Sequence, residues 1–249
     1  GTQQWTQFVV SGGVEMVWSV EQTADSGYVA TGTSLGPQFA DEDALFIKVS
    51  ANGTLLWTRT WGGLGQDSAA SMTELYNGNF LACGQTGAFG AGQNDVWALI
   101  LDDTGGMVNS RTYGTGLDEE GKYAMVTADS GYLIAGWARA GNGQQDGLLM
   151  KIDSNLSPIW TRTYAGVGDM VLTDLEELPT GEILASGTFE DANNRRAVAL
   201  KLDSAGGLIW AQQYDEISPH YLPGILPDKS LALSTDHGRQ KACQRLHWR

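Results

Sequence analysis

The stretch W-T-R-T-W-G-G at residues 57–63 is the main evidence for the fold, because similar stretches recur along the chain. W-T-R-T-Y-A-G follows at 160–166, and N-S-R-T-Y-G-T stands between them at 109–115. Copies of one motif about fifty residues apart are typical of a chain built from repeated structural units.

A second repeated series lies upstream of each copy. The segments G-Y-V-A-T-G (27–32), N-F-L-A-C-G (79–84), G-Y-L-I-A-G (131–136) and G-E-I-L-A-S-G (181–187) end in glycines 52, 52 and 51 residues apart. Each follows a turn rich in Asp, Asn, Ser or Gly, which predicts a tight hairpin. A weaker fifth copy is L-P-D-K-S-L-A-L-S-T at 226–235.

A third series completes the unit. The segments 43–53, 95–105, 146–156 and 196–206 each read as a half-buried strand followed by a polar turn, which leads into the W-T-R-T-Y-G motif. Each unit therefore has four short strands, with the Trp-containing strand outermost and its aromatic residues packed against the next unit.

Four antiparallel strands repeated every fifty residues predict an all-β fold, a β-propeller. We expect five blades in a single domain, 1–249, at about 14–63, 66–115, 118–166, 167–214 and 215–249. The last unit has room for three strands. The segment W-T-Q-F-V-V at 5–10 matches W-T-R-T-W-G, so it is expected to supply the missing outer strand and close the ring. A piece of a larger propeller is the alternative.

The units resemble the propeller repeats of bacterial secreted and surface proteins, written D-x-W-x-x-K-x-D-x-x-G-x-x-x-W-x-x-x-Y-G-G. I-D-S-N-L-S-P-I-W and L-D-S-A-G-G-L-I-W are also similar to the tryptophan-docking segments of quinoprotein-like propellers. The resemblance implies the fold and a secreted or periplasmic bacterial protein. Quinoprotein dehydrogenases have a vicinal cysteine pair that this chain lacks, so no quinone cofactor is expected.

The amino-acid composition excludes some classes of binding partner. A net charge of −14 argues against nucleic acid, and no apolar run is long enough to span a membrane. Cys83 and Cys243 both lie in apolar stretches and are expected to be buried free thiols. The protein is expected to act as a monomer.

The loops between the strands carry the candidate binding residues. Aromatic residues at nearly the same place in four units form a hypothetical stacking platform, with packing between blades as the alternative: Phe39, Phe89, Trp137 and Phe189. Recurring carboxylates are expected to accept backbone amides in turns, or else to bind cations or sugar hydroxyls: Asp67, Asp118 and Asp169, with Asp43, Asp95 and Asp146. No segment has EF-hand spacing, so no metal site or cofactor is assigned and calcium stays an open option.

Two sets of residues allow an enzymatic interpretation. The strand expected to line the axis carries Glu21, Glu74, Asp174, Glu176 and Glu177, and paired carboxylates can hydrolyse glycosides. His220, His237 and His247 lie in the last unit near Ser and Asp residues, but no G-x-S-x-G elbow accompanies them.

The sequence thus favours a binding module that recognises a glycan or a protein through its loop face. A glycosidase or esterase that uses the channel carboxylates or the last unit's histidines is one alternative. A structural repeat of a larger surface protein is another.

Overall fold

The computed structural model describes residues 5–8, 13–36, 41–192, 194–214, 224–225, 231–237 and 240–246, the last three ranges by their backbone. The chain forms two compact units, Gly1–Ala124 and Met125–Arg249. Each unit is described by itself below.

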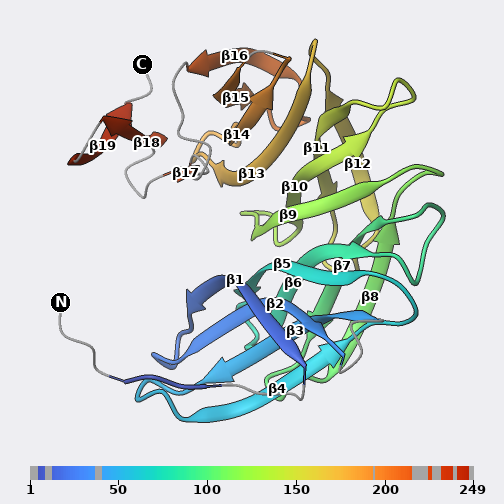
Figure 1. Ribbon diagram of the computed structural model, residues 1–249, viewed down its shortest axis with the longest axis vertical. Coiled ribbons are helices and arrows are strands. Elements are labelled where there is room, and N and C mark those ends of the chain that lie inside the picture. Colours follow the sequence, from blue (N-terminus) through green and yellow to red (C-terminus); the bar gives the residue numbers. More distant parts are fainter. Residues whose placement is uncertain are drawn as a thin grey trace. The chain divides into compact units, whose positions relative to one another are not determined.

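The first unit contains two four-stranded antiparallel sheets, drawn in blue to green in Figure 1. The first sheet has the order β1-β2-β3-β4, with β1 (Val14–Gln22), β2 (Tyr28–Leu35), β3 (Glu42–Val49) and β4 (Leu55–Trp61). The second has the order β5-β6-β7-β8, with β5 (Asp67–Glu74), β6 (Phe80–Thr86), β7 (Asp95–Leu101) and β8 (Met107–Tyr113). Strand β5 packs against β1, β2 and β3, so the second sheet lies over the first.

The second unit repeats this plan. Strand β9 (Glu119–Val126) spans the boundary and joins β10 (Tyr132–Arg139), β11 (Gln145–Ile152) and β12 (Pro158–Tyr164). The next sheet comprises β13 (Asp169–Glu177), β14 (Ile183–Glu190), β15 (Arg195–Leu202) and β16 (Leu208–Tyr214), and β13 packs on β10 and β11. A three-stranded sheet follows: β17 (Gly224–Ile225), β18 (Leu231–His237) and β19 (Gln240–Leu246).

The four predicted four-stranded repeats are confirmed, with the strand of the repeated W-T-R-T-Y-G-like motif at the outer edge of each sheet. A fifth four-stranded blade is not found among the described residues, where the last sheet has three strands. Residues 5–8, which belong to the expected closing strand, do not form a strand. Residues 9–10 lie outside the described part of the chain. Trp5 is held instead by ring contact with Tyr28, at a centroid distance of 5.9 Å.

The hairpin turns form where residues tolerate a positive φ. Ser26 and Ser130 take φ values of 66° and 64° in the two T-A-D-S-G turns, and Gly78 and Gly181 take 82° and 80° in the other two sheets. The predicted tight turns are therefore confirmed, because each needs a residue in the left-handed region.

The middle strands supply the core. β7 is buried along its whole length, whereas most residues of the outer strand β8 are exposed. A strand buried on both faces has a continuous apolar run, and V-W-A-L-I-L in β7 has this pattern.

In the first unit, the outer strand of one sheet docks on a glycine turn of the next sheet. Trp57 Nε1 donates a hydrogen bond of 2.8 Å to the Asp103 carbonyl, and Trp61 Nε1 donates one of 3.3 Å to the Gly105 carbonyl. Gly105 has a φ of 80°, and a Cβ there would lie 2.9 Å from Trp57 Cε3. The indole therefore fits only because this turn residue has no side chain.

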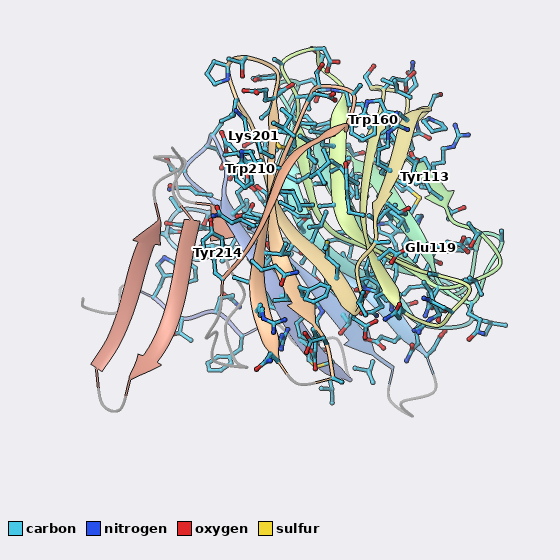
Figure 2. The ribbon with its side chains drawn as sticks, turned by 90° about the horizontal axis from the view of Figure 1, so that it is seen from above. Tyr113, Glu119, Trp160, Lys201, Trp210 and Tyr214 are labelled. Carbon is cyan, nitrogen blue, oxygen red and sulfur yellow. The ribbon has the colours of Figure 1, made fainter. Side chains whose placement is uncertain are left out.

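The same docking recurs in the second unit. Tyr164 Oη donates a hydrogen bond of 2.8 Å to the Gly206 carbonyl, and a Cβ at Gly206 would lie 3.0 Å from Trp160 Cζ3. Trp160 is labelled in Figure 2. The predicted packing of this strand's aromatic residues on the neighbouring sheet is thus confirmed within both units.

Trp5 docks in the same way on the first sheet. A Cβ at Gly53, which has a φ of 82°, would lie 2.7 Å from Trp5 Cγ. Gly53 occupies the place in its turn that Gly105 and Gly206 occupy in theirs. Trp5 therefore occupies the position of an outer-strand tryptophan, although its backbone forms no strand.

A buried lysine fastens the hairpin turn in the first and third sheets. Lys48 is 5% exposed, and its ammonium group donates to Thr23 Oγ1 and to Asp25 Oδ1, the latter at 3.0 Å. Lys151 donates to Thr127 Oγ1 and to Asp129 Oδ1, the latter at 2.6 Å. A buried ammonium needs such partners, because leaving it unpaired costs several kcal/mol, by a rough estimate.

We call these two contacts between a buried lysine and a hairpin turn the lysine clips. We predict that both clips make the stability of the fold sensitive to acid. The pKa of Asp25 is lowered to about 2 by the Thr23 hydroxyl, the Gly27 amide and Lys48, and that of Asp129 to about 2 by Lys151 and Thr127. A carboxyl whose pKa falls on folding stabilises the fold above its unfolded pKa of 3.8. This contribution is lost as the pH falls from about 4 to about 2.

Thermal denaturation at several pH values tests the prediction. Asp25→Asn and Asp129→Asn should each give a smaller loss of Tm between pH 4 and pH 2 than the unmodified chain. Asp103→Asn, in an exposed turn of the second sheet, is the matched control. An unchanged pH profile in both clip variants would contradict the prediction.

Candidate ligand-binding groove

An open groove of about 560 Å³ lies on the first unit, between the ends of its two outer strands. Its lining comes from β4, the β6–β7 loop, β7 and β8: Trp61, Gly62, Phe89, Trp97, Met107, Ser110, Arg111 and Thr112. We call this site the aromatic groove. It combines three aromatic rings with two hydroxyls and a guanidinium group.

Phe89 is the most distinctive wall of the aromatic groove. Its side chain is 49% exposed, while Trp97 beside it is 2% exposed, and the two ring centroids are 5.9 Å apart. Thr86 Oγ1 accepts hydrogen bonds from the amides of Ala88 and Phe89, which fixes the loop that presents the ring. A phenyl ring held half in water by an ordered loop is available for stacking.

The second unit has a corresponding groove of about 700 Å³ between the loop that follows β12 and strand β16. Phe189 takes the place of Phe89, because each ring packs over the last glycine of the outer-strand motif, Gly166 or Gly63. Val198 replaces Trp97, and an Arg196–Asp191 ion pair of 2.7 Å lies in the wall. The second groove is therefore less aromatic and more charged.

The predicted aromatic platform is only partly brought together. Phe89 and Phe189 line equivalent grooves, but Phe189 is 5% exposed. Trp137 is 8% exposed within β10, where Arg139 lies 5.5 Å from its ring centroid. Phe39 lies outside the described residues. Within the described chain, Phe89 is thus the member of the predicted set with an open ring face.

The predicted carboxylate series has a different register in the structure. Asp67 accepts the amide of Gly63, four residues earlier, and Glu119 likewise accepts the amide of Thr115. Glu119, labelled in Figure 2, therefore corresponds to Asp67 in its place at the start of an inner strand. Asp118 lies one residue before β9, and Asp169 accepts the amide of Gln145 instead. A constant spacing of 51 residues concealed this one-residue shift.

Two of the predicted catalytic carboxylates hold sheets together. Glu74 Oε2 accepts the Ala24 amide at 2.6 Å, and Glu177 Oε2 accepts the Ala128 amide at 2.7 Å. Each bond links an inner strand to the hairpin turn of the sheet before it. Glu21 Oε1 accepts the Thr73 hydroxyl at 2.9 Å, and burial raises the pKa of its carboxyl.

The remaining residues of the enzymatic interpretation are not brought together in a site by the described structure. Asp174 Oδ1 accepts the Leu175 amide, and Glu176 lies two residues further along β13. His220 and His247 lie outside the described residues, and His237 is described only by its backbone at the end of β18. Cys83 is a buried free thiol whose pKa is raised to about 12 by burial, which confirms its predicted state and makes it unreactive.

Sequence reasoning missed Trp61, Trp97 and Arg111 as site residues. Trp61 and Arg111 belong to the repeated outer-strand motif, which indicated packing rather than binding. The signal that could have found them is the position of the outer strand, which is partly solvent-exposed in each of the four four-stranded sheets and flanks a variable loop.

No family model and no curated protein matches the sequence. Solved structures with a similar fold include a protein of unknown function from Bacteroides caccae, at 14% identity and a TM-score of 0.51, over 86% of this chain and 72% of that one. The β-propeller domain of the Trilobed protease from Pyrococcus furiosus is similar at 10% identity and a TM-score of 0.44, over 92% and 70% of the two chains. An acylaminoacyl peptidase from Pyrococcus horikoshii is similar at 8% identity and a TM-score of 0.48, over 89% and 35%.

These likenesses concern the fold alone. The chain folds into four-stranded antiparallel sheets, as the repeats predicted, and the solved structures that it resembles include a β-propeller domain. Within the described residues, no helix has the length and hydropathy of a membrane span, and no group of three or more His, Cys, Asp or Glu side chains has the arrangement of a metal site.

Proposed function

We propose that the protein is a glycan-binding module and that the aromatic groove of the first unit holds a sugar ring. The observation that carries the proposal is the half-exposed Phe89 ring beside the buried Trp97, at the mouth of an open groove. A single exposed ring is common on protein surfaces, but this ring lies in one groove with Trp61 and Trp97, and an exposed apolar cluster of this kind favours a ligand.

The polar wall of the groove supports a sugar as that ligand. Ser110, Thr112 and Arg111 offer hydroxyl and guanidinium groups within the same groove as the rings. Sugars combine an apolar C–H face, which stacks on aromatic rings, with hydroxyls that need such hydrogen-bond partners. The chain's net charge of −14 favours a neutral glycan over an anionic one.

A glycan array followed by calorimetry with the retained sugar tests the proposal. Phe89→Ala should weaken binding about tenfold or more, because a stacking ring contributes both buried area and a specific ring contact. Arg111→Ala should also weaken it. Tyr76→Ala is the matched control, since Tyr76 is a 96% exposed aromatic residue in the same sheet, outside the groove lining.

Two outcomes would contradict the proposal. One is the absence of any retained sugar, and the other is binding that Phe89→Ala leaves unchanged. Turnover of the retained sugar, abolished by Glu74→Gln, would favour the glycosidase alternative. The bond from Ala24 to Glu74 argues for a structural role of that carboxylate. Secretion and a monomeric state remain predictions.

We also propose that the ring closes as a five-bladed propeller, with residues 5–10 as the outer strand of the last blade. Two observations support closure. Trp5 occupies the turn of the first sheet as an outer-strand tryptophan does, and β1 leaves Val17, Trp18 and Val20 more than half exposed. Such an apolar strand needs a neighbour to cover it.

The strand register gives a sharp test of closure. In the fourth sheet Gln212 pairs with Ala199, which pairs with Ser186. Ser234 corresponds to Ser186 and pairs with Cys243, and Gln7 follows Trp5 as Gln212 follows Trp210. Gln7→Cys should therefore form a disulfide with Cys243 under mild oxidation, read by mass spectrometry.

Thr6→Cys is the control, because the adjacent residue points to the opposite face of a strand. A Gln7→Cys chain that stays reduced, or one that links no better than Thr6→Cys, would contradict closure.

A further inference from the structure

Two buried carboxylates converge beside Gly114, at the end of the second sheet's outer strand. Asp95 is 1% exposed and Glu119 is 4% exposed. A Cβ built on Gly114 would lie closer than 3.0 Å to both Asp95 Oδ1 and Glu119 Oε2. The two oxygens therefore approach one point, in a space that exists because residue 114 has no side chain.

One of these oxygens has no partner. Asp95 Oδ2 accepts the amides of Ala91 and Gly92 at 2.9 Å and 3.0 Å, whereas Asp95 Oδ1 is buried without a hydrogen-bond partner. The unpartnered oxygen is the one that points toward Gly114 and Glu119. A buried carboxylate oxygen without a partner costs free energy, and a second carboxylate beside it raises that cost.

The surroundings do not balance this charge. Both oxygens of Glu119 accept bonds from Thr115, through its amide at 3.1 Å and its hydroxyl at 2.6 Å. Among the described residues, no lysine or arginine forms an ion pair with Asp95 or Glu119. A positive charge from outside the chain would relieve the repulsion between them.

Backbone oxygens lie beside Gly92, a residue that binds Asp95. The carbonyl oxygens of Thr115 and Leu117 surround Gly92, whose amide binds Asp95; they approach the place of a Gly92 Cβ to 3.0 Å or less. Carboxylates, backbone carbonyls and water are the ligands that calcium prefers.

A comparison with the other sheets shows that the glycine and the two carboxylates occur together. In the first sheet, Asp43 and Asp67 also approach Gly62, but Asp43 is only partly buried, so the second sheet's pair is the one in which both carboxylates are buried. In the third sheet, Asp146 occupies the strand position of Asp95, but Ala165 and Met170 replace the glycine and the second carboxylate. Glycine thus accompanies the carboxylate pair and disappears with it, as expected if the pair needs the space.

We propose that Asp95 and Glu119 bind a calcium ion beside Gly114, with backbone carbonyls and water completing its oxygen ligands. The ion would fasten the loop before β9 to the loop before β7, which also carries Phe89. The proposal is independent of the sugar site, because neither Asp95 nor Glu119 lines the aromatic groove.

Scanning calorimetry of the full chain with calcium and with EDTA tests the proposal. Calcium at a hundredfold excess over its Kd should raise the Tm by about 5–10 °C, and magnesium should raise it less. Asp95→Asn should abolish the calcium shift and should raise the Tm of the metal-free protein, because it removes the unbalanced charge. Asp146→Asn, at the same strand position in the third sheet, should leave the calcium shift unchanged.

Other results would overturn the proposal. One is a Tm that calcium does not change, and another is a calcium shift that survives Asp95→Asn, which would place the ion elsewhere.

Discussion

The contact between an indole and a glycine turn is the constraint on which the rest of the structure depends. Each sheet alone has a large apolar face, and the sheets are stable only when these faces cover one another. The indole of Trp57 packs on the Gly105 turn and donates a hydrogen bond to the Asp103 carbonyl. It therefore fixes where the next sheet lies, while the apolar strands provide most of the driving force.

The sequence keeps the two partners of this contact together. The turns with glycine at this position, Gly53, Gly105 and Gly206, follow an outer-strand motif that carries Trp. The third sheet's turn has Leu156 there, with a φ of 64° and a fully buried side chain. The outer-strand motif before it carries Asn109 at the Trp position. All four turns have a positive φ at this position, but the residue is glycine only where the preceding motif supplies an indole.

Much of the fold could be predicted from the sequence, because strands and turns depend on local residue patterns. The four-stranded units, the T-A-D-S-G turns and the outer position of W-T-R-T-Y-G all follow from period-two alternation and from residues that accept positive φ. The fifth blade could not be settled in this way, because its closing strand depends on pairing between distant parts of the chain. Trp5 illustrates this difference. Its contact with Gly53 is the one that the repeat predicts, but residues 5–8 do not form the predicted strand.

The candidate site was less predictable, because it depends on exposure and register. Phe89 and Phe189 match in sequence and line equivalent grooves, yet only the Phe89 ring is half exposed. The carboxylate series was off by one residue, since Glu119 rather than Asp118 corresponds to Asp67. Glu74 attracted a catalytic interpretation, although its carboxylate binds a backbone amide of the preceding hairpin. Spacing alone does not distinguish a side chain that binds its own fold from one that faces a ligand.

A double-mutant cycle on Trp57 and Gly105 tests the central claim most directly, through the free energy of unfolding in urea. Gly78 has nearly the same φ as Gly105, at 82° against 80°, but nothing lies within 4 Å of the place of its Cβ. Gly78→Ala should therefore cost only the backbone strain, about 1 kcal/mol. Gly105→Ala should cost at least 2 kcal/mol more, by a rough estimate, because it also displaces the indole. In a Trp57→Ala background, its cost should fall toward that of Gly78→Ala, because Arg59 Cγ, 2.8 Å from the place of the Cβ, can then move into the space that the indole leaves. An equal cost of Gly105→Ala with and without Trp57 would contradict the account.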